Sequence, residues 1–353
     1  MPRVVVGLSG GVDSAVAAYL LRAMGYDVIG ITLRTWLPDG GTESRCCEIG
    51  EAEKIASFLN IPYYVRNAVS PFYNAVAVPF FADYLHGKTP NPCVLCNPRI
   101  KFAGLLEAAD TMHAAYAATG HYAVIKHCEN DRLSVMRAQH VEKDQSYMLC
   151  RLTQQQIART LFPLGALSKA EVRSIAEQIG LPAAKRPDSQ EICFVPDGSY
   201  ADLIAAEHPE ALPAPGDFVD QAGNVVGRHQ GIHRYTVGQR RGLGLALGEP
   251  VYVLGVDAAH NTVRVGPESA LFASEITCRN LHFMGLSPEA ALQDYRCAAK
   301  IRYRHPAAEC TVTRAETDLL RVRFMSPVRA PAPGQTAVFY AEDGSILMCG
   351  VII

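Results

Sequence analysis

The chain has 353 residues, of which 49% are hydrophobic and 19% are charged, so it can build two or three globular domains. Its formal net charge of -2 by itself predicts no polyanionic partner, and no apolar run approaches the roughly 18 residues of a membrane span. The strand pattern begins at Val4, which leaves no room for a signal peptide. We therefore expect a cytoplasmic protein without a membrane partner, whose eleven cysteines are thiols and in which any disulfide is catalytic rather than structural.

The sequence GLSGGVDS at 7–14 lies between a strand pattern at 4–8 and a helix pattern at 14–24. Gly10 and Gly11 allow a sharp turn that brings the backbone close to a ligand. The backbone N–H groups and the positive end of the helix dipole then favour an anion. The side chains of the motif can cap the helix or bind a phosphate-bound cation. This is not a Walker A loop, because no Gly-Lys-Ser/Thr closes it, and the glycine spacing does not match a GxGxxG dinucleotide site.

Strand and helix patterns alternate through the first half of the chain. This alternation predicts an α/β domain at 1–207, built on a doubly wound parallel sheet with ligands at the carboxyl ends of its strands. An irregular segment is expected at 181–190. The remaining strands are predicted at 28–33, 63–65 and 115–119, and the remaining helices at 51–59, 72–85, 100–109, 154–160 and 169–179.

The segment GKTPNPCVLCNPRIKF at 87–102 carries three prolines, which predict an irregular loop leading into the helix at Ile100. Cys96 precedes that helix, where the helix dipole together with Arg99 and Lys101 favours a thiolate. Cys193 lies in another proline-bracketed polar segment, PDSQEICFVPDG. Neither cysteine is expected in a core.

The second half of the chain has a different sequence pattern. After the proline-rich linker HPEALPAPGD, short alternating runs separated by glycine predict hairpins. We expect a small β-rich central domain at 208–272 and a C-terminal β-barrel at 273–353. The segment 225–248 contains several arginines and no acidic residue. A second basic segment, from Arg296 to Ala330, contains seven arginines and one lysine. Local basic surfaces of this kind can hold nucleic acid.

The motif at 9–14 resembles the SGGxDS loop of the PP-loop ATP pyrophosphatases, which adenylate a substrate oxygen and release pyrophosphate. With six further motifs in order, the chain is similar nearly end to end to the tRNA-specific 2-thiouridylases, which place sulfur on C2 of the wobble uridine, U34. Those motifs are NPCVLCNPRIKF at 91–102, TGHYA at 119–123, KDQSYML at 143–149, SQEICFV at 189–195, HRYTVGQRRGLG at 233–244 and IRYRH at 301–305.

The resemblance implies that ATP with Mg²⁺ activates the C2 oxygen, and that sulfur arrives as a persulfide from a sulfur-carrier protein or a cysteine desulfurase. Cys193 would carry the persulfide and Cys96 would be the nucleophile, in one version leaving a Cys96–Cys193 disulfide, with Asp13 as a third catalytic residue. Residues implied to bind ATP are Gly7, Leu8, Ser9, Gly10, Gly11, Val12, Asp13, Ser14, Leu33 and Gly120. Residues implied to contact tRNA are Asn91, Pro92, Cys93, His121, Lys143, Asp144, Gln145, Arg302, Tyr303 and Gln335.

One position departs from the family pattern, because Cys93 stands where many relatives have Asp. Cys93 and Cys96 form a CxxC, and as an alternative to the persulfide relay this pair and Cys193 would supply three thiolates to a 4Fe-4S cluster with one iron open to hydrosulfide. Zinc would need a fourth ligand. Two other functions remain open at this point. One is a PP-loop ligase acting on a small carboxylate or ureido group, and the other is a metal-bearing RNA-binding module without catalysis.

Overall fold

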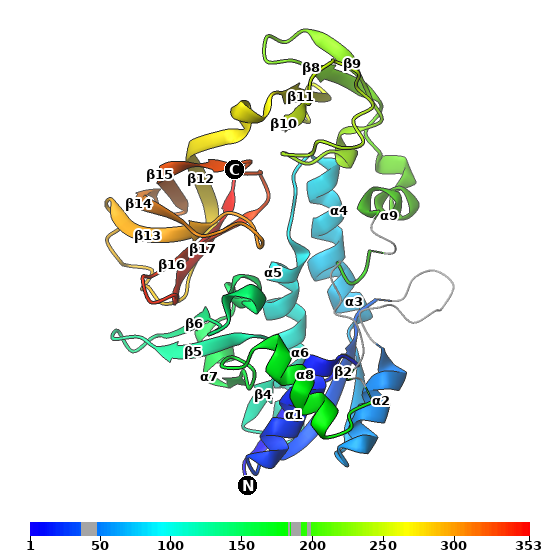
Figure 1. The fold of residues 1–353 in the computed structure, drawn as a ribbon, viewed down its shortest axis with the longest axis vertical. Coiled ribbons are helices and arrows are strands. Elements are labelled where there is room, and N and C mark those ends of the chain that lie inside the picture. Colours follow the sequence, from blue (N-terminus) through cyan, green and yellow to red (C-terminus); the bar gives the residue numbers. More distant parts are fainter. Residues whose placement is uncertain (37–47, 183, 185–191, 196–198) are drawn as a thin grey trace.

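The computed structural model describes residues 1–36, 48–182, 184, 192–195 and 199–353. It has three parts, with the N-terminal domain at the bottom of Figure 1, a small β sheet at the top and a β-barrel at the left. The predicted fold class is therefore confirmed. No helix in these described ranges has both the length and the apolar character needed to cross a membrane.

A five-stranded parallel sheet forms the centre of the N-terminal domain, in the order β3-β2-β1-β4-β7. Val4 and Val6 pack on one face of the sheet and Val5 on the other, as the two-residue period of a strand requires. Because both faces are buried, β1 reads as an uninterrupted apolar run. The five strands are β1 (Arg3–Gly7), β2 (Asp27–Arg34), β3 (Tyr63–Asn67), β4 (Tyr116–Ala118) and β7 (Thr160–Leu161).

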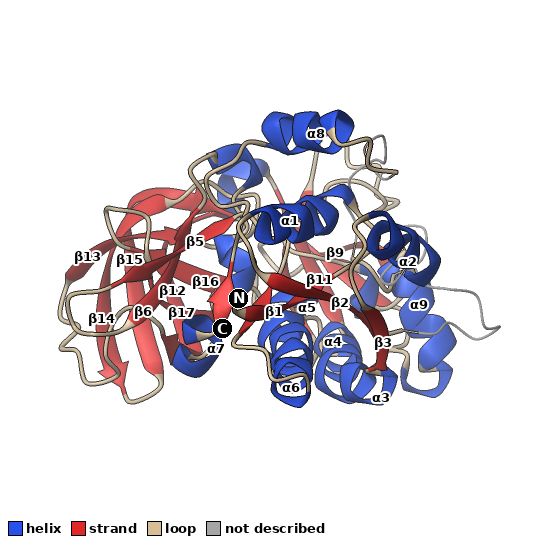
Figure 2. Cartoon of the chain, turned by 90° about the horizontal axis from the view of Figure 1, so that it is seen from below, coloured by secondary structure: helices blue, strands red, loops and turns tan. Residues whose placement is uncertain are grey.

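Helices cover both faces of this sheet, as Figure 2 shows. On one face lie α1 (Val12–Ala23), α2 (Ile49–Phe58) and α8 (Lys169–Gln178), and on the other lies α6 (Ala103–Thr111). The predicted doubly wound arrangement is thus confirmed. The other helices are α3 (Val69–Phe72), the π-helix η1 (Tyr73–Ala77), α4 (Val78–Leu85), α7 (Gln154–Ala158) and α9 (Tyr200–Glu207).

The prediction of an irregular loop at 87–102 is wrong from Pro92 onward, whereas residues 87–91 form neither helix nor strand. Pro92–Cys96 forms helix α5, Asn97–Phe102 forms the π-helix η2, and α6 follows without a break. Pro92 stands in the first turn, where a missing N–H costs no helical hydrogen bond. Asn91 caps the helix, with its Oδ1 accepting from the backbone N–H of Cys93 at 3.1 Å. The wider π turn accommodates Pro98, whose carbonyl accepts from Gln156 Nε2 at 2.7 Å.

A hairpin that the sequence patterns did not predict joins the N-terminal domain to the barrel. Its strands are β5 (Ala123–His127) and β6 (Leu133–Arg137). Ser134 Oγ donates to the carbonyl of Ile346 at 2.7 Å, and Arg137 N donates to the carbonyl of Gly344 at 3.0 Å. The hairpin therefore connects the N-terminal domain to the barrel through hydrogen bonds to barrel carbonyl groups.

The C-terminal half contains the central sheet and the closed barrel. The central sheet has the order β10-β11-β8-β9, and the barrel has the order β12-β15-β14-β13-β16-β17. The central strands are β8 (Gly216–Val219), β9 (Val225–His229), β10 (Tyr252–Asp257) and β11 (Thr262–Gly266). The barrel strands are β12 (Phe272–Phe283), β13 (Tyr295–Lys300), β14 (Ala308–Glu316), β15 (Leu319–Arg329), β16 (Thr336–Tyr340) and β17 (Ile346–Ile352). Short 3₁₀ turns lie at Val141–Lys143, Ser146–Leu149, Pro209–Ala211, Ile232–Arg234 and Glu268–Leu271.

Candidate functional site

The glycine turn lies where it was predicted, at the carboxyl end of β1 in the middle of the parallel sheet. Gly10 has φ +85°, a conformation that favours glycine, and Gly11 is the N-cap of α1. In the described part of the chain no side chain caps α1, because its N-cap residue, Gly11, has none; Ser14 Oγ donates to the carbonyl of Gly11 at 3.0 Å. The N–H groups of the first turn therefore point toward the turn without a side-chain acceptor, which suits a phosphate.

Gly120 holds the end of β4 against the start of α1. A Cβ at this position would lie 2.6 Å from the backbone N of Ser14 and 2.7 Å from the carbonyl carbon of Asp13. Only glycine allows these two backbone segments to approach so closely. The structure thus brings Gly120 to the predicted ATP loop, from the strand next to β1.

Asp13 is held in a network that sequence reasoning missed. Lys169 Nζ, from the first residue of α8, lies 2.7 Å and 2.9 Å from the two carboxylate oxygens of Asp13. The hydroxyl of Tyr122 donates to Asp13 Oδ1 at 2.7 Å. Gln145 in turn accepts from the backbone N–H of Tyr122 at 3.1 Å through its side chain. The Ser168–Glu171 capping box marks the start of α8 in the sequence, but no spacing signal connects Lys169 to Asp13.

Several of the predicted tRNA-contacting residues come together from distant parts of the chain. Tyr303 of the barrel lies within electrostatic range of Cys93 in α5 and of Lys143 and Arg304. Burial raises the pKa of Tyr303, while the charges of Lys143 and Arg304 oppose that shift. Burial also raises the pKa of the Cys93 thiol, and nearby Lys101 counteracts it. Lys143 and Arg304 place two cations beside this amphipathic ring, together with the carboxylate of Asp144, and an aromatic ring with neighbouring cations suits a nucleotide.

His121 borders this group as a neutral imidazole. Its Nδ1 lies 2.7 Å from Thr119 Oγ1, and its ring packs near Phe102 and Phe162. Burial, aided by the positive charge of Lys101, lowers the pKa of His121 to about 3. His121 therefore contributes a hydrogen-bonding ring and no positive charge at neutral pH.

Other predicted tRNA contacts make internal hydrogen bonds in this structure. Asp144 is buried and accepts from the backbone N–H groups of Ala138 and Ser146 at 3.2 Å and 3.0 Å. Gln335 Nε2 donates to the carbonyl of Thr89 at 2.7 Å. These side chains position the backbone around the candidate site.

Arg302 connects two domains. It donates from one guanidinium nitrogen to the carbonyls of Val237 and Ala330, both at 2.8 Å. Val237 belongs to the segment after the central 3₁₀ turn and Ala330 follows β15 of the barrel. Arg302 therefore links the central domain to the barrel through hydrogen bonds, independently of any contact with RNA.

The environments of Cys96 and Cys193 differ from the prediction. Cys96 is only 6% exposed and lies at the end of α5 within an apolar cluster, so the expectation that it precedes a helix outside the core is wrong. Cys193 is half-buried and itself packs against this same cluster. The structure therefore brings Cys96 and Cys193 to one side-chain cluster. The predicted irregular segment at 181–190 lies largely outside the described residues.

The three cysteines proposed for a cluster do not gather into a ligand set. Across the described residues, which include Cys93, Cys96 and Cys193, no group of three or more His, Cys, Asp or Glu side chains is placed to hold a metal ion. Cys93 and Cys96 occupy neighbouring turns of one helix, and Cys193 belongs to the segment that covers it. The donor arrangement does not fit a 4Fe-4S cluster.

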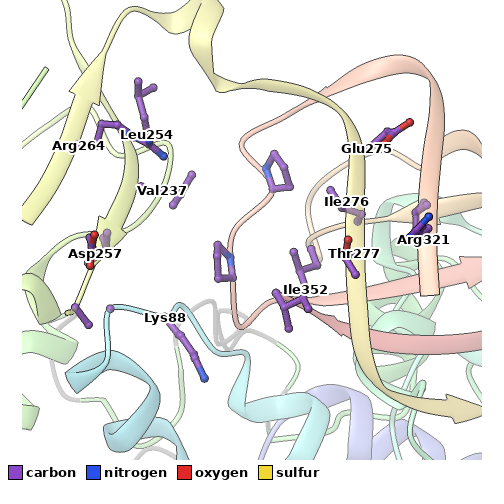
Figure 3. A pocket seen from close by; sticks show the side chains of 18 of the residues that line it. Lys88, Val237, Leu254, Asp257, Arg264, Glu275, Ile276, Thr277, Arg321 and Ile352 are labelled. Atoms are coloured by element: carbon purple, nitrogen blue, oxygen red, sulfur yellow. The ribbon is translucent and has the colours of Figure 1, made fainter. Parts of the chain in front are cut away.

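A cavity of about 1150 Å³ lies between the central sheet and the barrel, away from the predicted site. Figure 3 shows Arg264 and Asp257 on the central side, Glu275 and Arg321 on the barrel, and Lys88 below. Charges of both signs line it, and Arg323 is paired with Glu275. None of the predicted site residues lines this cavity.

Three family models match successive stretches of the chain. They are the tRNA methyl transferase HUP domain at 2–197, the tRNA methyl transferase PRC-barrel domain at 204–267 and the aminomethyltransferase beta-barrel domain at 273–353. The tRNA-specific 2-thiouridylase MnmA 1 of Caldanaerobacter subterraneus subsp. tengcongensis is 44% identical over 99% of this chain and 97% of its own. The tRNA-specific 2-thiouridylase MnmA of Clostridium perfringens is 43% identical over 97% of this chain and 96% of its own.

Among solved structures, the U34-tRNA thiolase NcsA from Methanococcus maripaludis with its 4Fe-4S cluster is similar with a TM-score of 0.35 and 23% identity. The similarity covers 60% of this chain and 67% of that one. A likeness of this size carries no inference about the site described above.

Proposed function

Because the chain belongs to the tRNA-specific 2-thiouridylase family, we propose that it is an ATP-dependent tRNA 2-thiouridylase acting on wobble uridine. It activates the C2 oxygen of U34 with AMP and replaces that oxygen with sulfur. The observation that carries the proposal is the 44% identity to a 2-thiouridylase over 99% of the chain. The glycine turn at the carboxyl end of β1 adds a physical basis, because it is built to receive phosphate.

Adenylation is assigned to the loop from Gly7 to Ser14 together with Gly120 and Leu33. The first turn of α1 offers its backbone N–H groups to the phosphates, and the Asp13 carboxylate would hold the Mg²⁺ that accompanies ATP. The C2 oxygen attacks the α-phosphorus, the bond to the bridging oxygen breaks, and the electron pair leaves with pyrophosphate. Fixed amide dipoles stabilise the charge that develops on the leaving group.

The target nucleotide is assigned to the surface formed by Asn91–Cys93, Lys143 and Tyr303. This surface combines the capped start of α5 with an aromatic ring supplied by the barrel. His121, whose pKa is lowered to about 3, is neutral there and is suited to hydrogen bonding with a base. The basic barrel and central domain would extend the contact along the tRNA backbone.

Sulfur delivery is assigned to Cys193 and Cys96. A persulfide on Cys193 is formed by a sulfur-carrier protein or a cysteine desulfurase. The Cys96 thiolate attacks Cys193 Sγ, hydrosulfide leaves, and a Cys96–Cys193 disulfide forms. Hydrosulfide then attacks C2, AMP leaves with the former C2 oxygen, and an external thiol reductant supplies two electrons to reset the disulfide. Since Cys96 is 6% exposed, the cluster that covers it must open before transfer.

We derive no step through an iron–sulfur cluster, because the three candidate cysteines are not placed to ligate one metal centre. The relay needs only two cysteines at one cluster of side chains, which is the arrangement described for Cys96 and Cys193.

The proposal is tested with single cysteine-to-serine variants. Cys193→Ser is expected to carry no persulfide and to leave tRNA unthiolated. Cys96→Ser is expected to accumulate a persulfide that it does not transfer. Cys93→Ser is expected to remain active, as is the matched control Cys128→Ser, which changes a half-buried cysteine after β5. Persulfide is measured by mass spectrometry, and thiolated tRNA by its retardation in mercury-containing gels.

Normal thiolation by Cys193→Ser would contradict the relay. Joint loss of iron, visible absorbance and thiolation in Cys93→Ser, Cys96→Ser and Cys193→Ser would favour a cluster instead. Failure of the wild type to release pyrophosphate from ATP in the presence of tRNA and a sulfur donor would contradict the assignment as a 2-thiouridylase.

A further inference from the structure

Lys169 occupies an unusual electrostatic position above the glycine turn. It is the first residue of α8, and its side chain reaches Asp13 in the first turn of α1. Its ammonium therefore lies at the amino-terminal ends of two helices, where the helix dipoles favour anions and disfavour cations. Its side chain is 13% exposed, compared with 66% for Lys54 in the exposed Lys54–Glu51 pair on α2.

The position of Lys169 is fixed by local structure. Ser168 caps α8 by accepting from Glu171 N at 3.2 Å, and Glu171 Oε2 accepts from Ser168 N at 2.7 Å. Val172 and Ala176 anchor α8 in the core beneath α1. The carboxylate of Glu171 is engaged in its capping box, and the Asp13 carboxylate lies at hydrogen-bonding distance from the Lys169 ammonium.

We propose that Lys169 is a phosphate-binding residue of the adenylation site, held by Asp13 until ATP arrives. This inference rests on the proposed function and adds to it the residue that receives the leaving pyrophosphate. When magnesium-bound ATP enters, the Asp13 carboxylate exchanges its ammonium partner for the metal ion, and Lys169 turns to the β- and γ-phosphates. The exchange leaves every charge paired, so neither group is buried alone.

The same contact supports the chemical step. As the bond between the α-phosphorus and the bridging oxygen breaks, negative charge grows on pyrophosphate. A lysine ammonium is a mobile point charge that can follow this oxygen. No electron is gained or lost by the protein, and Lys169 remains protonated throughout.

The decisive experiment compares Lys169→Met in two backgrounds, the wild type and Asp13→Asn. Inorganic pyrophosphate without Mg²⁺ is the probe, and its dissociation constant is measured by calorimetry. A direct phosphate contact predicts that Lys169→Met weakens binding about tenfold in the Asp13→Asn background, where no Asp13 carboxylate competes for the ammonium, a loss typical of one charged contact. If Lys169 acted only by orienting Asp13, Lys169→Met would have no effect in the Asp13→Asn background, and this result would overturn the proposal.

The matched control is Lys54→Met, which removes another lysine from an acidic partner and should leave the dissociation constant unchanged. Thermal unfolding of each variant establishes that it is folded. The double variant removes both charges together, so it stays informative if Lys169→Met alone is unstable. A wild type that binds neither pyrophosphate nor ATP would contradict the proposed function. Binding that is insensitive to Lys169→Met in both backgrounds would contradict only the present inference.

Discussion

Replacing Gly120 by alanine tests the assembly of the adenylation site from two strands of the sheet. The new Cβ would meet Ser14 N at 2.6 Å, Asp13 C at 2.7 Å and Asp13 O at 2.9 Å, where ordinary contacts begin at 3.4 Å. All three atoms belong to the backbone, so no side chain can turn aside. The first turn of α1 or the end of β4 must therefore move by roughly 1 Å.

Gly120→Ala should affect protein stability and the rate of pyrophosphate release, and the two effects can be measured separately. Overpacking of this kind costs about 1–3 kcal/mol of the free energy of unfolding, which is measured by urea titration. A displacement of about 1 Å at the phosphate loop lowers a catalysed step by about 100-fold. We therefore expect tRNA-dependent pyrophosphate release to fall by about that factor, while tRNA binding measured by filter retention stays close to the wild-type value.

Gly50→Ala is the control. Gly50 is in the first turn of α2, and a Cβ there would meet no atom within 4 Å among the described residues. Alanine at this position should leave activity unchanged and stabilise the helix by about 0.5–1 kcal/mol. Wild-type stability together with wild-type pyrophosphate release in Gly120→Ala would refute the close approach between Gly120 and α1.

Three further predictions concern Arg302, Arg240 and His121. Arg302→Ala should lower the free energy of unfolding by about 2–4 kcal/mol, because the carbonyls of Val237 and Ala330 lose a charged donor. The exposed Arg240→Ala should preserve the thermal midpoint and reduce the salt dependence of tRNA binding by about 0.7–0.9 in log-log slope; unchanged salt dependence would count against the central domain as a docking surface. The pKa of His121 is lowered from its ordinary value of 6.5 to about 3 in the folded protein. Between these two pH values the His121 side chain is therefore protonated in the unfolded chain and neutral in the folded protein. The stability contributed by neutral His121 is thus complete above pH 6.5 and is lost toward pH 3, with a slope of at most about 1.4 kcal/mol per pH unit. His121→Gln should flatten this slope in urea titrations between pH 4 and 6.5, and an identical slope in the variant would show that His121 titrates normally.

The sequence alone determined the features that depend on neighbouring residues. The strand, the glycine turn and the helix of the predicted phosphate loop are contiguous at 4–23, so their order in the sequence was sufficient to predict a phosphate site there. The two-residue and helical periods likewise predicted the doubly wound sheet, the small central β domain and the barrel, as the structure confirms.

Local signals were insufficient where proline could be accommodated in more than one way. Pro92 and Pro98 suggested a loop, but a first-turn position and a π turn allow both to remain in a helix. The consequence is chemical, because the helix places Cys96 inside an apolar cluster rather than on an accessible loop.

Only the tertiary structure decided which distant residues share the site. Lys169 reaches Asp13 because α8 packs on the same face of the sheet as α1, and Tyr303 approaches Cys93 because the barrel docks on the N-terminal domain. Arg302, predicted from its motif as an RNA contact, is engaged by carbonyls of two domains. Sequence periodicity records which face of an element is buried, whereas the identity of its partner depends on long-range packing that no local pattern encodes.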